Sequence, residues 1–153
     1  MRMPTQNDLP LLGSQRRRLE KLYLKTEYRV QLGERNVSFQ LGSHDPVAEA
    51  LLRKALPIRG TWAILTPCNP RSQEATEKLN SFYHHELRDA LETDHMLWLQ
   101  AVNHDPSGIW PDEPGFLIAD AEPLWLQELG RRFHQNALVS TRLGEAPRLV
   151  WLA

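Results

Sequence analysis

The feature that most constrains this chain is the order of its apolar segments from residue 61 onward. Short apolar runs bounded by glycine or proline are typical of buried strands, whereas apolar residues spaced three and four apart are typical of amphipathic helices. The predicted elements are a strand at 61–66, a helix at 72–91, strands at 96–102 and 116–120, a helix from 123, and strands at 137–141 and 148–152.

The first six of these elements follow the order strand–helix–strand–strand–helix–strand. This is the ferredoxin-like, split βαβ order, in which both helices cover one face of an antiparallel sheet. Upstream, the 15–29 segment has the spacing of a short helix, the 28–42 segment that of a hairpin, and Asp45 can cap a helix that Pro46 begins. We therefore expect an α+β fold: a ferredoxin-like core with an extra C-terminal strand and an N-terminal hairpin and helix.

The length of 153 residues suits a single domain. Residues 1–14 show no apolar period, so we expect a flexible tail followed by one domain at 15–153 with its core at 60–152. The hydrophobic fraction of 41% and the charged fraction of 24% are ordinary for a soluble protein. No apolar run approaches the ~18 residues of a membrane span, and the first residues lack a signal-type apolar region. The sequence thus predicts a cytoplasmic protein with no membrane partner.

Positive charge is concentrated near the start of the chain. The formal net charge is −1, yet the 15–29 segment carries six basic and only two acidic residues. A basic helix can place its side chains on the phosphates of RNA or of the ribosome, although charge runs are more often solvated faces. The residues that would bind nucleic acid are Arg16, Arg17, Arg18, Lys21 and Lys25.

The predicted topology brings three loops to one edge of the sheet. Chain direction places the loop after the first strand, the loop between the second and third strands, and the loop after the second helix at the same end. These loops are 67–72, 103–115 and 134–136, and they hold most of the unusual polar residues. Together with the nearby Asn80 they predict a ligand-binding site made of Asn69, Arg71, Ser72, Asn80, Trp110, Glu113, Gln135 and Asn136.

Several of these residues also have a purely structural interpretation. Ser72 can simply cap the following helix. The functional alternative is anion capture by the free N–H groups at that helix N-terminus together with the Arg71 guanidinium. Glu113 is either a solvated loop carboxylate or, beside Trp110, a partly desolvated acid or base with a raised pKa. An ion pair between Arg71 and Glu113 would instead make this edge a structural clasp.

The sequence offers no strong nucleophile or metal signature. Cys68 would lie near a helix N-terminus, which can lower the pKa of a thiol, but no motif fixes a histidine beside it. His84 and His85 are adjacent on a helix, whereas helical metal ligands are normally three or four residues apart. Phosphate-binding loops, dinucleotide glycine patterns and nucleophile elbows are absent from the sequence. We therefore predict no cofactor and no metal.

Several stretches resemble a known family. They are TWAILTPCNPRSQEATEKLN, HDPSGIWPDEPGFLI, FHQNALV and the closing RLVWL. Their order and spacing are similar to the bacterial family catalogued as domain of unknown function 3293, over about residues 60–152 and more loosely at 28–30. In that family an aromatic residue often precedes the Asn-Pro step, where this chain has Cys68, which argues against a catalytic thiol. The resemblance implies no particular reaction.

Three functions therefore remain open. The first is a small binding or regulatory module whose polar edge engages a small molecule or a partner protein, and it fits best because no nucleophile–base set is recognisable. The second is RNA or ribosome binding through the basic 15–29 segment. The third is an enzyme that uses Glu113 as acid or base and Arg71 as an anion clamp.

Overall fold

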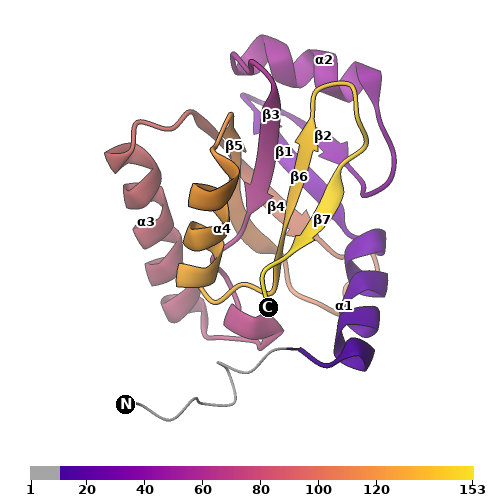
Figure 1. The fold of residues 1–153 in the computed structure, drawn as a ribbon, viewed down its shortest axis with the longest axis vertical. Coiled ribbons are helices and arrows are strands. Elements are labelled where there is room, and N and C mark those ends of the chain that lie inside the picture. The colour runs from indigo at the N-terminus through magenta and orange to yellow at the C-terminus, as the bar shows by residue number, and fades with distance from the viewer. Residues whose placement is uncertain (1–10) are drawn as a thin grey trace.

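A computed structural model describes residues 11–153, so the first ten residues of the expected tail lie outside the described residues. This described part is a mixed α/β fold with four α-helices and a seven-stranded sheet (Figure 1). Helix α1 starts inside the 1–14 segment that we expected to be a tail. The helices are α1 (Gly13–Lys25), α2 (Pro46–Ala55), α3 (Glu77–Thr93) and α4 (Pro123–Arg132). The strands are β1 (Glu27–Leu32), β2 (Arg35–Phe39), β3 (Thr61–Leu65), β4 (Trp98–His104), β5 (Glu113–Ala119), β6 (Ala137–Arg142) and β7 (Arg148–Trp151).

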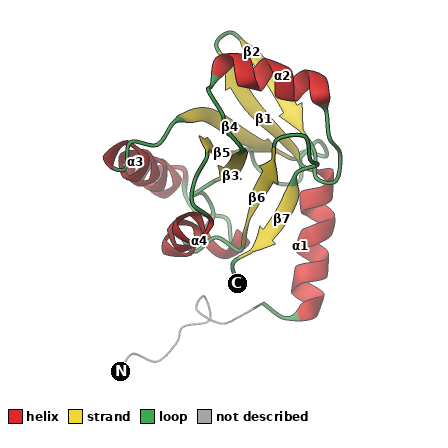
Figure 2. Cartoon of the chain, turned by 45° about the horizontal axis from the view of Figure 1, so that its top comes forward, coloured by secondary structure: helices red, strands yellow, loops and turns green. Residues whose placement is uncertain are grey.

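The strands form one antiparallel sheet in the order β2-β1-β4-β5-β3-β6-β7. The four central strands, β4-β5-β3-β6, come from the predicted strand–helix–strand–strand–helix–strand segment. The predicted hairpin, β1 and β2, extends the sheet beside β4, and the extra C-terminal strand, β7, extends it beside β6. The sheet is curled, as Figure 2 shows, so the added strands lie around the same core as the central ones.

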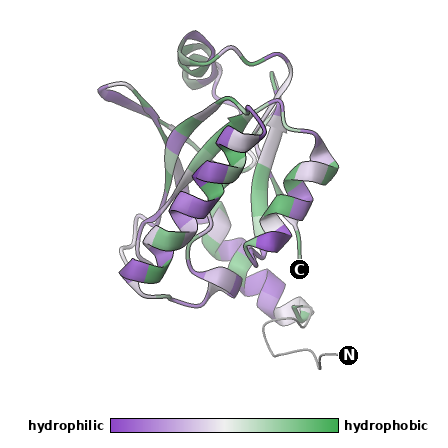
Figure 3. Ribbon diagram, turned by 90° about the vertical axis from the view of Figure 1, so that its left-hand side faces the viewer, coloured by the Kyte–Doolittle hydropathy of each residue, from purple (hydrophilic) through white to green (hydrophobic). Residues whose placement is uncertain are grey.

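Different helices cover the two faces of the sheet. Helices α3 and α4 pack on one face, where Leu87, Leu91 and Leu129 meet Phe116 of β5. They lie on the same side of the sheet in Figures 1 and 2, which confirms the expectation for these two helices. Figure 3 looks onto this side and shows many hydrophilic positions on the outer surface of α3. Helix α2 covers the opposite face through Leu52.

Helix α1 lies beside the C-terminal edge strand. The Arg16 guanidinium stands 5.2 Å from the ring centroid of Trp151, and the rings of Tyr23 and Trp151 have centroids 6.0 Å apart. The predicted apolar stripe of this helix, which includes Leu19 and Leu22, faces the sheet across a small cavity. Packing against β7 therefore fixes the position of α1.

The expectation that Ser72 caps the following helix is wrong. The N-cap of α3 is Thr76, whose Oγ1 accepts a hydrogen bond from the backbone N–H of Leu79 at 3.2 Å. Ser72 instead ends a tight turn in which the φ angles of Asn69, Arg71 and Ser72 are 49°, 58° and 57°. A right-handed helix requires negative φ, so it cannot run through these left-handed residues and begins only after them.

The loop predicted at 103–115 is shorter than expected. Its ends belong to β4 and β5, where Asn103 pairs with Glu113. The residues at these strand ends are typical of turns, so the sequence predicted a loop there. Pairing with a neighbouring strand overrides such weak local preferences. At Gly115 the chain passes so close to β3 that a Cβ atom would lie 2.4 Å from the carbonyl oxygen of Leu65. Glycine is needed there because only a residue without a side chain fits.

Candidate functional site

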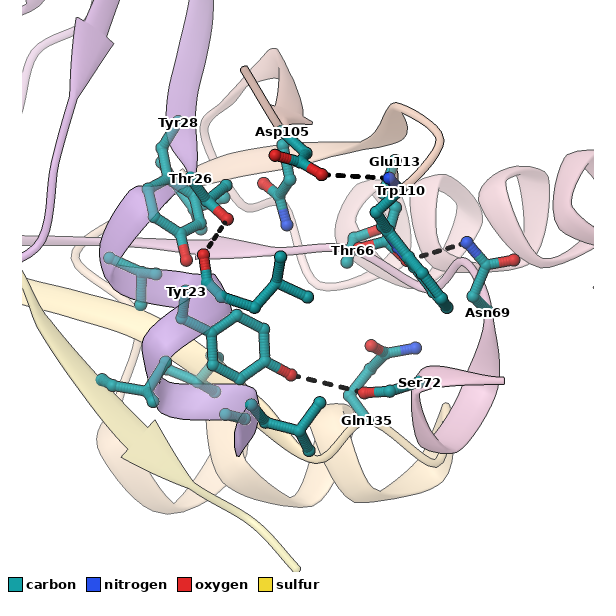
Figure 4. A pocket seen from close by; sticks show the side chains of 18 residues that line it. Tyr23, Thr26, Tyr28, Thr66, Asn69, Ser72, Asp105, Trp110, Glu113 and Gln135 are labelled. Atoms are coloured by element: carbon teal, nitrogen blue, oxygen red, sulfur yellow. Dashed lines mark hydrogen bonds between the residues drawn. The ribbon is translucent and has the colours of Figure 1, made fainter. Parts of the chain in front are cut away.

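A cavity lies between α1 and the sheet, at the end where the loops after β3, β4 and α4 meet (Figure 4). Its volume is about 70 Å³, enough for a few water molecules or a small ligand. One part of the wall is apolar and is formed by Leu19, Leu22, Ile64, Ala137, Leu138, Val139 and Leu149. The polar and aromatic part is formed by Tyr23, Thr26, Tyr28, Thr66, Asn69, Ser72, Asn103, Asp105, Trp110, Glu113 and Gln135.

Side-chain hydrogen bonds hold the three loops together. Between the loop after β3 and the start of β5, Asn69 Nδ2 donates to Glu113 Oε2 at 2.8 Å. Between the loops after β3 and α4, Gln135 Nε2 donates to the carbonyl oxygen of Cys68 at 3.0 Å. The predicted convergence of these loops at one edge is therefore confirmed.

The loop after α4 also fixes the tight turn that Ser72 ends. Asn136 Nδ2 donates to Ser72 Oγ at 2.8 Å, and the backbone N–H of Arg71 donates to the carbonyl oxygen of His134 at 2.7 Å. Asn136 is buried but does not line the cavity. Its contact is thus a support for Ser72, which does line it.

Asn69 and Asn80 form a reciprocal amide pair. The backbone N–H of Asn69 donates to Asn80 Oδ1, and Asn80 Nδ2 donates to Asn69 Oδ1, both at 2.9 Å. Asn69 Oδ1 also accepts the backbone N–H of Ala75 at 2.9 Å. The carbonyl end of the Asn69 side chain is therefore fully used, and its NH₂ group is left to donate to Glu113. Asn80, in the first turn of α3, positions Asn69 without lining the cavity itself.

Glu113 is a half-buried carboxyl group of the cavity wall. Burial raises the pKa of this carboxyl above its ordinary value, and the hydrogen bonds that it accepts from Asn69 and Trp110 lower it by less. The direction of this shift is the one expected for the desolvated carboxyl that the sequence offered as an alternative. Its first neighbour is a neutral amide, since it is Asn69 that donates to it.

Two tyrosines face this carboxyl across the cavity. Tyr28 is 2% exposed, and among residues 11–153 its hydroxyl makes no hydrogen bond of ordinary geometry, only a weak contact with the Thr26 side chain. Tyr23 reaches Ser72 Oγ with its hydroxyl at 3.5 Å (Figure 4). Burial is the main cause that raises the pKa of both phenols, and the negative charge of Glu113 raises both further. The three groups thus share one electrostatic environment.

The Arg71 side chain does not belong to the cavity wall. The ion pairs among residues 11–153 do not include one between Arg71 and Glu113. The helix N-terminus that was expected to assist Arg71 in anion capture is also absent from this turn, because α3 begins at Glu77. The structure therefore does not support the expected anion site or the expected Arg71–Glu113 clasp.

Asp105 positions Trp110 rather than a ligand. Its carboxylate accepts hydrogen bonds from the Ser107 side chain and from the backbone N–H groups of Ser107 and Trp110 at 2.8 to 3.0 Å. The side-chain hydrogen bond from Ser107, followed by the backbone ones, lowers the pKa of Asp105. This tight turn holds the Trp110 indole in the cavity wall.

Sequence reasoning missed the contribution of α1 and β1 to the site. Tyr23, Thr26 and Tyr28 come from these elements, and Asn103 is the residue that pairs with Tyr28 across β1 and β4. The available signal was the apolar stripe of α1, but no local pattern says that β1 pairs with β4. Thr66, directly after β3, was also missed, because it ends a continuous apolar run that was assigned to a buried strand.

The Cys68 thiol is not an activated nucleophile. Burial raises its pKa to about 11, so it is protonated near neutral pH. Its Sγ donates to the carbonyl oxygen of Pro114 at 3.4 Å. The thiol therefore has a packing role beside the cavity.

The basic residues of α1 divide into two groups. Arg16 stacks on Trp151 and donates to the carbonyl oxygen of Ala153, so it is engaged within the fold. The other four are exposed on the outer surface of the helix, and they are Arg17, Arg18, Lys21 and Lys25.

Two further properties concern residues 11–153 only. In this range, groups of three or more His, Cys, Asp or Glu side chains that could hold a metal ion are absent. The same range contains no helix that is both long and apolar enough to cross a membrane.

The fold and the cavity define a mixed α/β protein in which an N-terminal helix closes a polar pocket on an antiparallel sheet. Residues 65–138 match the family described as "Protein of unknown function (DUF3293)", which confirms the resemblance predicted from the sequence. Among curated proteins and among solved structures, nothing matches the chain.

Proposed function

We propose that this protein is a small binding module whose ligand occupies the cavity between α1 and the sheet. The observation that carries the proposal is the Tyr28 hydroxyl, which is buried in the cavity wall and makes no hydrogen bond of ordinary geometry among residues 11–153, its weak contact with the Thr26 side chain leaving the phenol oxygen free to accept. An unpaired buried hydroxyl costs ~1–3 kcal/mol. A ligand with a polar group beside Tyr28 would recover this free energy.

Two other features support a binding role. A carboxyl group with a pKa raised by desolvation is typical of functional sites, and Glu113 is such a group in the same wall. The left-handed conformations of Asn69, Arg71 and Ser72 are costly for residues with side chains, and such strain clusters at functional sites. Strain and desolvation therefore coincide at one end of the sheet.

A second candidate function is acid–base catalysis by Glu113. Its raised pKa favours this role, because a general acid or base works best when its pKa lies near the working pH. Arg71 would have no part in it, since its side chain is not in the cavity wall. Binding remains the first choice because the buried Cys68 thiol beside the cavity is protonated and, among residues 11–153, no cysteine, lysine or histidine lines the cavity.

We also infer that β3 to β6 form a ferredoxin-like unit. The strand order β4-β5-β3-β6, the antiparallel pairing and the placement of α3 and α4 on one face support this inference. On this view the N-terminal segment, α1 to β2, is an addition that closes the binding cavity over one face of the unit.

The binding proposal is tested by screening small polar fragments against the full chain in ¹⁵N–¹H correlation spectra. At least one fragment should saturably shift the Trp110 indole N–H and the Ser72 amide. Tyr28→Phe should lower the affinity for that fragment by about three- to tenfold, which corresponds to the loss of one net hydrogen bond. Tyr83→Phe is the matched control, because Tyr83 lies on α3 outside the cavity, and it should leave the affinity unchanged. If none of the fragments saturably shifts either signal, the proposal is wrong.

A further inference from the structure

The geometry points to a ligand that carries a small cationic ammonium group, held between Glu113 and Tyr28. This inference rests on the proposed function and names the chemical class of the ligand. Three properties of the cavity wall carry it: the sign of its charges, the kind of hydrogen-bonding group left free, and its aromatic side chains.

All the charged side chains in the cavity wall are acidic. Among residues 11–153, eighteen form the wall, and none of these is lysine, arginine or histidine. Of the two carboxylates, Asp105 is occupied by Ser107 and by the backbone N–H of Trp110. Glu113 is therefore the charge that a ligand meets. A bound anion would face this charge without a counter-ion, whereas a cation would neutralise it.

Three polar side chains of the wall donate their hydrogens to backbone carbonyl oxygens. Gln135 Nε2 donates to the carbonyl oxygens of Cys68 and Phe133, at 3.0 and 3.4 Å, which leaves its side-chain oxygen to face a ligand. The hydroxyls of Thr66 and Thr26 likewise donate to backbone carbonyls, each at 2.8 Å. The donors of these three side chains are thus used within the protein itself.

The unused acceptors suit an ammonium group. A carboxylate has about four acceptor positions, and Asn69 and Trp110 supply only two donors to Glu113. The Tyr28 oxygen is also free to accept. A primary ammonium carries three N–H donors and no acceptor, so it complements this set better than a carboxylate or phosphate does.

Aromatic side chains complete the fit. Trp110 and Tyr23 stand on different sides of the space drawn in Figure 4, and Tyr28 adds a third ring. Aromatic faces attract cations, most strongly where water is excluded. The volume of about 70 Å³ admits only a few non-hydrogen atoms. The ligand is therefore a small amine or the amine end of a longer molecule.

Three probes of similar size and different charge test the inference: ethylammonium, acetamide and acetate. Each is titrated into the full chain while the Trp110 indole N–H and the Ser72 amide are followed by NMR. We expect ethylammonium to saturate both signals with a dissociation constant on the order of millimolar, as befits so few atoms, and acetate to leave them unchanged. Acetamide should bind more weakly than ethylammonium.

Variants then show which groups hold the cation. Glu113→Gln should lower the affinity for ethylammonium at least tenfold and change the affinity for acetamide less than threefold, because only the cation loses a charge-assisted hydrogen bond. Glu74→Gln is the matched control, since Glu74 is exposed and outside this cavity, and it should change neither. If Glu113→Gln does not fold, Tyr28→Phe serves instead and should weaken ethylammonium at least threefold.

The outcomes separate this inference from the proposed function. Saturable binding of acetamide or acetate without binding of ethylammonium would overturn the cationic ligand and leave the binding cavity intact. Equal weakening of ethylammonium and acetamide by Glu113→Gln would overturn it as well. If none of the three probes shifts the cavity signals and the wider fragment screen also fails, the proposed function is wrong and this inference falls with it.

Discussion

The side-chain amide of Asn69 donates a hydrogen bond to the Glu113 carboxylate over 2.8 Å. This contact joins the turn after β3 to the first residue of β5. It places a neutral donor where the sequence suggested the guanidinium of Arg71. The carboxyl is consequently held in place but not neutralised, and it remains available to a ligand.

The first prediction concerns this contact. Asn69→Gly and Glu113→Ala, made singly and together, should be non-additive in the free energy of unfolding by about 1–2 kcal/mol, because they share one hydrogen bond to a charged group. Glycine is chosen because it tolerates the φ of 49° at this position. The effects of Arg71→Ala and Glu113→Ala should instead add within about 0.5 kcal/mol. Urea denaturation measures both cycles. Strong coupling of Glu113 to Arg71, without coupling to Asn69, would support the ion-pair clasp instead.

The second prediction is that Tyr28→Phe stabilises the ligand-free protein by about 1 kcal/mol. The variant removes a buried hydroxyl that makes no hydrogen bond of ordinary geometry among residues 11–153 and keeps the ring that packs in the core. Tyr83→Phe on α3 should change the free energy of unfolding by less than about 0.5 kcal/mol. A clear loss of stability in Tyr28→Phe would show that the hydroxyl is paired within the fold.

The third prediction concerns pH. Burial raises the pKa of Glu113 in the folded protein, whereas in the unfolded chain a glutamate titrates near ~4.3. The folded state therefore binds this proton more tightly, and the contribution of Glu113 to stability is largest at low pH. It falls as the pH rises through the window between the unfolded and the folded pKa, by up to about 1.4 kcal/mol per pH unit.

Urea denaturation of the wild type and Glu113→Gln at a series of pH values isolates this contribution. The free energy of unfolding of the wild type, minus that of the variant, should fall from about pH 4 upward and then level off. A difference that increases with pH would mean that the fold lowers the pKa of Glu113.

The fourth prediction concerns the close approach of β3 and β5. Gly115→Ala should cost about 2–3 kcal/mol or prevent folding, since its Cβ would lie 2.4 Å from the backbone oxygen of Leu65. Gly60→Ala is the control, because a Cβ at that position meets no atom within 4 Å. It should change the free energy of unfolding by less than about 1 kcal/mol. Equal effects of the two substitutions would contradict the close approach.

The fifth prediction tests the RNA alternative. Arg17, Arg18, Lys21 and Lys25 are exposed on α1, and binding of single-stranded RNA through these four charges would give a log–log salt slope of roughly −3. Replacing all four by alanine should abolish such binding and leave cavity ligands unaffected. If the wild type binds no RNA at low salt, as measured by fluorescence anisotropy, the charges serve only as a solvated face.

Much of the edge that carries the site could be predicted because it follows from chain direction. The loop that contains Asn69, the loop that ends at Glu113 and the loop that contains Gln135 must emerge at one end of a strand–helix–strand–strand–helix–strand unit, whatever their turn types. What failed was local detail. Ser and Thr are both good helix caps, so the sequence could not choose between Ser72 and Thr76. The choice depended on the left-handed backbone conformation of the turn before Thr76, which amino-acid composition does not predict.

The sequence by itself determined the order of the elements, the placement of α3 and α4 on one face of the sheet, and the convergence of the three loops at one edge. These three features follow from the spacing of the apolar residues and from the order of the elements, and both can be read from the linear sequence. Only the tertiary structure decided that Tyr23 and Tyr28 face Glu113 across a cavity. That arrangement depends on the pairing of Tyr28 with Asn103 and on α1 packing against Trp151. Such contacts join segments far apart in the chain, and their stability comes from the burial that they create together rather than from any local pattern.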